Sequence, residues 1–120
     1  MGVVIDFDGT DQGSVLFAGW FFRQLAQDVL ERNSANVELK QVFDHAEAFD
    51  GLLINQMQPD VASIVTREIR AVAEDILSGK FQSGIAKRPF GNENTQRTYE
   101  RGLRELLHAA SHEQANGGAN

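Results

Sequence analysis

The chain has 120 residues, of which 42% are hydrophobic and 23% charged, and its net charge is −6. This length fits one domain with a real core, and the composition lies far from that of disordered proteins. There is no cysteine. Disulfides, thiolate metal sites and thiol catalysis are therefore excluded.

The charge is uneven along the chain. Residues 1–50 carry nine acidic and three basic side chains, whereas residues 80–120 carry four acidic and six basic ones. An acidic surface repels nucleic-acid phosphate and attracts basic proteins. The N-terminus lacks the basic region of a signal peptide, and the longest apolar run, Val15 to Phe22, is too short to span a membrane. We expect a cytoplasmic protein with no membrane partner.

The first elements are a short strand and a helix. Val3–Phe7 is mostly β-branched and precedes a dense cluster of turn-forming residues. Two starts are open for the helix that follows. Either Ser14 caps it, or residues 15–17 form a second strand and the helix begins near Trp20. The side chains expected on the polar face of this helix are Arg23, Gln24, Gln27, Asp28 and Glu31.

Apolar side chains at helical spacing predict three more helices. The second spans residues 39–53, with a potential break at 50–51. The third, which has the clearest amphipathic pattern, begins at Gln58-Pro59 and ends at Gly79. A loop over 80–92 leads to the last helix.

These elements predict a mainly α fold, with a short N-terminal β element packed beside an irregular bundle of about four helices. We expect one helical domain over residues 1–113. Residues 114–120 are rich in Gly and Asn and predict a disordered tail.

Residues 3–10, Val-Val-Ile-Asp-Phe-Asp-Gly-Thr, place two aspartates after an apolar strand. This segment resembles the first motif of haloacid dehalogenase-type phosphatases. The resemblance implies magnesium-dependent phosphoryl transfer, with Asp6 as nucleophile and Asp8 as acid/base. It covers eight residues, and we find no counterpart of the family's other motifs in the sequence. The alternative is a tight turn at Asp8-Gly9 with Asp6 facing solvent.

His108 and His112 are four residues apart, so on a helix they point the same way, as metal-binding pairs do. They lack the glutamate of the zinc-protease motif, and nothing local links His45 to them. Exposed histidines near a helix C-terminus are the preferred interpretation. We predict no catalytic residue, no metal and no cofactor, and we lean toward a chain that is not an enzyme.

The last helix carries a basic face. Arg97, Arg101 and Arg104 fall within about a 60° sector, nearly opposite the apolar side chains. Lys87 and Arg88 in the preceding loop could enlarge this basic patch, which would then be a candidate surface for binding nucleic acid. The alternative is a solvated face with ion pairs along the helix. Because the chain as a whole is acidic, we expect no nucleic-acid partner.

The leading hypothesis is a small acidic module that binds and modulates or neutralises a basic protein, as immunity proteins and small inhibitors do. Asp44, Glu47 and Asp50 cluster on the second helix, and no Lys or Arg lies between Lys40 and Arg67. Such a cluster steers cationic partners. Trp20 borders the apolar face of its helix and is the candidate anchor, with a core position as the alternative. A homo-oligomer is left open.

Overall fold

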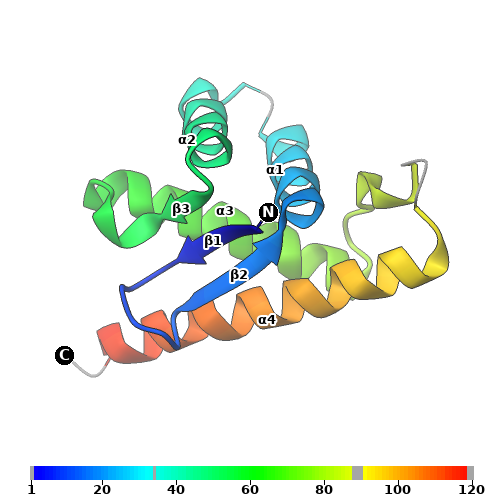
Figure 1. Cartoon of the computed structure of the whole chain (residues 1–120). Helices are drawn as coiled ribbons and strands as arrows, with labels where there is room; N and C mark the ends of the chain where they lie inside the picture. Colours follow the sequence, from blue (N-terminus) through cyan, green and yellow to red (C-terminus); the bar gives the residue numbers. More distant parts are fainter. Residues whose placement is uncertain (1, 34, 88–90, 119–120) are drawn as a thin grey trace.

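The computed structural model describes residues 2–33, 35–87 and 91–118, with side chains up to Ser111 except that of Ala86. Its mainly α architecture, with a small N-terminal sheet packed against helices, confirms the predicted fold class (Figure 1). The strands are β1 (Gly2–Asp6), β2 (Ser14–Ala18) and β3 (Gly51–Leu53). The helices are α1 (Gly19–Arg32), α2 (Val37–Ala48), α3 (Pro59–Ser78) and α4 (Glu93–Gly118), with short 3-10 turns η1 (Ile54–Gln56) and η2 (Gly84–Lys87).

The sheet has the order β2-β1-β3, with β1 antiparallel to β2 and parallel to β3. Ile5 lies opposite Val15 on one side and Leu52 on the other. Because side chains alternate across a strand, Val3, Ile5 and Phe7 are buried against the helices. The opposite face carries Leu16, which is 72% exposed. The sheet is therefore covered on one face only.

The structure settles the open start of the first helix. Residues 14–18 form β2, and α1 begins at Gly19, so the reading with a second strand is right. Ser14 pairs with Asp6 in the sheet and caps no helix. The physical reason is that Val15 and Phe17 complete the buried sheet face opposite Ile5 and Val3.

The predicted second helix is too long at its C-terminal end, but the potential break at 50–51 coincides with a turn in the structure. Helix α2 ends at Ala48, and residues 51–53 form β3 beside β1. Asp50 has a φ of 56°, a left-handed conformation that Asp tolerates better than most residues. This turn redirects the chain, and the Asp50 carbonyl accepts a hydrogen bond from the Val4 N–H at 3.2 Å. Leu52 is then buried in a strand and Ile54 in η1, whereas Leu53 between them is 36% exposed.

The third helix is confirmed at both ends. Pro59 occupies its first turn, and Gly79 follows it with a φ of 82°. The Gly79 N–H donates to the Ile76 carbonyl and the Lys80 N–H to the Asp75 carbonyl, the hydrogen-bond pair of a Schellman motif. Helix α4 runs beside β2 along the length of the molecule (Figure 1). The backbone of α4 is helical to Gly118 and so runs through residues 114–118 of the predicted tail, while residues 119–120 and the side chains after Ser111 lie outside the described residues.

Helix α4 comes into close contact with α1 at Gly102. A β-carbon at this position would overlap the ring of Phe21. That ring is 3% exposed and stacks on Phe17 with 4.2 Å between centroids, so it has little room to move. Gly102 therefore serves the contact of α4 with α1 and β2.

We expect Gly102→Ala to lower the free energy of unfolding by about 1–3 kcal/mol, as overpacked cores do. This sign is opposite to the usual one, since Ala in a helix interior is about 1 kcal/mol more stable than Gly. Urea unfolding followed by circular dichroism measures the change. Glu105→Ala, at an exposed position of the same helix, is the control and should shift stability by less than about 0.5 kcal/mol. A higher unfolding midpoint for Gly102→Ala would contradict the close contact.

Candidate functional site

Two hollows flank helix α2. The larger, about 860 Å³, lies between α1 and α2 and has an apolar floor of Ala26, Leu30 and Phe43. Its polar lining consists of Arg23, Gln27, Glu31, Asp44, Glu47 and Lys87, with Gly84 from η2. Three carboxylates and two cationic side chains therefore face this groove. Asp44 and Glu47 are two of the predicted partner-binding residues.

The second hollow, about 400 Å³, lies between α2 and β3. It is lined by Val42, His45, Ala46, Phe49, Gly51, Leu52, Leu53, Gln56 and Met57. Its lining contains no Lys, Arg, Asp or Glu and consists mainly of apolar side chains. Phe49 stands at its rim, 71% exposed, with its ring 4.5 Å from that of His45. We name this hollow the α2–β3 pocket.

Helix α2 and the turn after it form an exposed ridge that separates the two hollows, and the predicted acidic residues lie along it. Asp44, Glu47 and Asp50 are all exposed. The Asp44 carboxylate pairs with Lys40 at 2.8 Å, but both side chains are at least 60% exposed, and such pairs are weak. Asp44 and Glu47 therefore share the lining of the α1–α2 groove, whereas Asp50 follows the end of α2 and lines neither hollow. Lys40 is the only Lys or Arg in α2.

The remaining candidate residues lie elsewhere. Trp20 packs on the core beside Phe21 and Tyr99, at centroid distances of 6.1 and 6.5 Å. It lines a small hollow with Asn94, Thr95 and Thr98 of α4, and none of the three predicted acidic residues is among these contacts. The structure therefore does not bring the proposed anchor beside the acidic cluster.

The basic side chains of α4 form a solvated face. Arg97 pairs with Glu93, and Arg101 and Arg104 are exposed. Lys87 lines the α1–α2 groove instead of continuing this face, and Arg88 lies outside the described residues. Nucleic-acid binding by this face stays an untested hypothesis.

Asp6 and Asp8 are engaged in the loop that joins β1 to β2. The Asp6 carboxylate accepts a hydrogen bond from the Gly9 N–H at 2.7 Å. The Asp8 carboxylate accepts from the Thr10 N–H and hydroxyl at 2.9 and 2.7 Å. These contacts are those of Asx turns, which agrees with the turn interpretation. Phosphoryl transfer at this loop stays a prediction.

The most extensive polar contacts in the described part surround Asp28, which the sequence placed on the polar face of its helix. The side chain is fully buried. Its Oδ1 accepts hydrogen bonds from Gln24 Nε2 and the Gly84 N–H, both at 3.0 Å. Its Oδ2 accepts from the Ser83 hydroxyl at 2.5 Å and the Tyr99 hydroxyl at 2.8 Å.

This arrangement is a clamp rather than a reactive centre. Four donors occupy the two carboxylate oxygens, and Ser83 Oγ also accepts from the Ile85 N–H at 3.1 Å. No side-chain polar atom in the described part is buried without a partner. The clamp joins α1, the segment before η2, and α4, and so fixes the Gly84 end of the α1–α2 groove.

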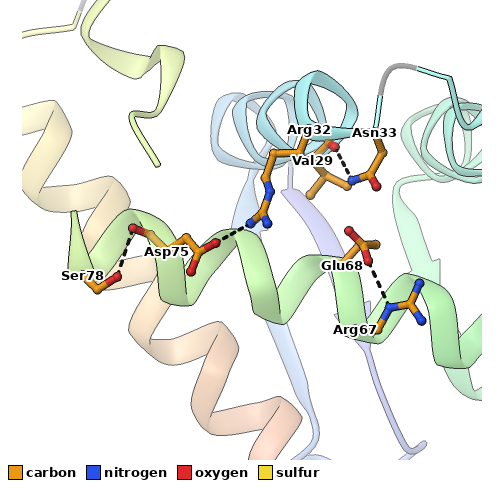
Figure 2. A network of polar contacts seen from close by, with 7 residues as sticks. All are labelled: Val29, Arg32, Asn33, Arg67, Glu68, Asp75 and Ser78. Atoms are coloured by element: carbon orange, nitrogen blue, oxygen red, sulfur yellow. Dashed lines mark hydrogen bonds and ion pairs between the residues drawn. The ribbon is translucent and has the colours of Figure 1, made fainter. Parts of the chain in front are cut away.

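A second connection joins the end of α1 to α3 (Figure 2). Arg32 at the end of α1 donates to the Asp75 carboxylate of α3 at 2.8 Å, with side chains 29% and 30% exposed. Its guanidinium group lies 5.7 Å from the ring centroid of Phe81, a cation–π arrangement. The Asp75 carbonyl accepts from the Phe81 N–H at 3.1 Å. The loop after α3 is therefore tied to both α1 and α3.

Searches for a metal site, for a membrane-spanning helix and for similar proteins complete the description. Among the described residues, no group of three or more His, Asp or Glu side chains could hold a metal ion; His108 is exposed, and the side chain of His112 is not described. No helix in that part of the chain is long and apolar enough to cross a membrane. Comparison with known protein families, curated proteins and solved structures gave no match.

We expect Asp28→Asn to lower the free energy of unfolding by at least about 2 kcal/mol, because the amide NH₂ would face buried donors that need an acceptor. Tyr99→Phe removes one donor and should cost about 1 kcal/mol. Hydrogen exchange should also show faster exchange of the Gly84 and Ile85 amides in Asp28→Asn. Asp75→Asn, on a partly exposed ion pair, is the control. An equal loss of stability in Asp28→Asn and Asp75→Asn would rule out the clamp.

Proposed function

We propose that this chain is a non-enzymatic module that binds a basic protein and modulates or neutralises it in the cytoplasm, as small inhibitors and immunity proteins do. The observation that carries the proposal is the exposed acidic cluster of Asp44, Glu47 and Asp50 on a ridge between two hollows. A partner seated on this ridge can make charged contacts with α2 and fill a concave surface on either side.

The charge distribution supports a cationic partner. No Lys or Arg occurs from residue 41 to residue 66, whereas four acids do, and the whole chain carries −6. Like-signed charges on one surface add at long range and raise the rate at which an oppositely charged protein arrives. Glu31 adds a further carboxylate on the facing wall of the α1–α2 groove. Arg23 and Lys87 offset part of that charge inside the groove, so the exposed ridge is the stronger attractor.

Steering alone gives little lasting affinity. Charges are screened over about 8 Å at physiological ionic strength, so a stable complex also needs desolvated apolar contacts at its centre. Trp20 is packed on the core near α4, which argues for a structural role. Apolar side chains next to the ridge are better placed to hold the partner.

We expect the combined variant Asp44→Asn, Glu47→Gln and Asp50→Asn to slow association strongly at low salt and little at high salt. Asn is chosen at residue 50 because it also tolerates the left-handed conformation found there. The partner is first recovered by co-purification with the wild-type chain from native cells. Stopped-flow association at ionic strengths of about 0.01 M and 1 M then measures the effect.

The control for this variant removes the same charge elsewhere, through Asp11→Asn, Glu74→Gln and Glu105→Gln at exposed positions. It should change the association rate much less. Equal slowing at both ionic strengths would show that the carboxylates of Asp44, Glu47 and Asp50 do not steer the partner toward the complex. Recovery of a partner that is not basic would contradict the proposed function itself.

A further inference from the structure

We propose that the α2–β3 pocket is the anchoring site of the complex, and that it receives one large apolar side chain from a Lys- or Arg-rich segment of the partner. This inference rests on the proposed function and adds to it the chemistry of the bound segment. It also moves the anchor from Trp20 to the surface formed by Phe49, Leu53 and Met57.

The pocket combines a hollow with exposed apolar rims. Phe49 is 71% and Leu53 36% exposed, and both line it. Large apolar side chains that gather around a concavity typically mark binding surfaces, and aromatic side chains are frequent hot spots. A volume of about 400 Å³ lies at the lower end of the range for small-ligand sites. The pocket therefore suits a side chain rather than a folded element.

The floor of the pocket is held in place by the fold. Leu52 and Ala46 are each 1% exposed, and Leu52 is paired with Ile5 of the central strand. The Phe49 N–H donates to the His45 carbonyl and the Met57 N–H to the Ile54 carbonyl, both at 3.1 Å. A hollow that exists before binding costs little ordering entropy when it is filled.

Charge selects the kind of segment that brings the apolar side chain. Asp50 is exposed and lies in the chain between the lining residues Phe49 and Gly51, and the residues from 41 to 66, which include the whole pocket lining, contain no Lys or Arg. An anionic amphiphile such as a fatty acid would meet like charge at this rim. Two copies of the chain, placed pocket to pocket, would also bring their Asp50 carboxylates toward one another. A cationic protein segment that carries an apolar side chain would be attracted by the acidic rim and would bury that side chain in the apolar interior.

The experiment is a peptide-display selection on the intact wild-type chain, using a random library. We expect enriched peptides to share one aromatic or large aliphatic residue flanked by Lys or Arg. The best peptide is synthesised and its dissociation constant measured by fluorescence anisotropy. Phe49→Ser should weaken binding about tenfold or more. Replacing the apolar residue of the peptide by Ala should weaken it similarly and add little further loss in Phe49→Ser.

Leu16→Ser is the matched control, because Leu16 is 72% exposed and lies on β2 outside the pocket lining. It should leave binding within about twofold, and neither variant replaces a buried side chain. Amide shifts in NMR spectra on peptide addition should concentrate at residues 45–57.

The failures of the two proposals are distinguishable. Basic peptides that bind Phe49→Ser as tightly as the wild type would overturn the pocket and leave the basic partner standing. Enrichment of peptides without Lys or Arg would contradict the basic partner. Concentration-dependent self-association, abolished by Phe49→Ser in sedimentation, would show that a second copy fills the pocket and would overturn the inference.

Discussion

The fold depends on a carboxylate that is buried without a cation among its hydrogen-bond partners. A charged group removed from water is costly unless hydrogen bonds replace its solvation. Asp28 meets this condition only when α1, the Ser83-Gly84 segment and α4 are all in place. Three stretches of chain that share no strand pairing are thus positioned by one side chain. The Gly84 end of the α1–α2 groove is shaped as a result.

Among the described residues, no comparable hydrogen-bond network ties helix α2 to other elements, and the helix is placed by apolar packing. Leu39, Phe43 and Ala46 are each 1% exposed, and the ring of Phe43 lies 5.8 Å from that of Phe22 in α1. Its exposed side is mostly polar, with Val37 exposed at its start and Phe49 exposed just after its end. The buried face of α2 packs on the core, and the proposed contacts with the partner would come from its exposed face.

Local patterns were sufficient to predict most of the fold and little of the site. The helical spacing of apolar residues, with Pro59 at the start and Gly79 at the end, predicts α3 correctly. These features depend only on residues that are close in the sequence. The three residues of β3 were missed because a strand this short exists only through its pairing with β1. Asp28 looked like a solvent-facing residue, since its partners Ser83 and Tyr99 lie 55 and 71 positions away. The exposed Phe49 had the helical spacing of a core residue, and only the turn at Asp50 takes it out of the core.

The 71 positions between Asp28 and Tyr99 also constrain how the protein can fold as it is synthesised. A nascent chain that ends before α4 lacks the Tyr99 hydroxyl, so burying α1 at that stage would leave the Asp28 carboxylate without one of its hydrogen bonds. Such intermediates should keep this side of α1 in contact with water, and the core should close late, after Tyr99 has left the ribosome. Closure of so long a loop by contacts distant in sequence is slow by comparison with a local helical bundle. During synthesis from the N-terminus, closure of the core around Asp28 therefore depends on α4.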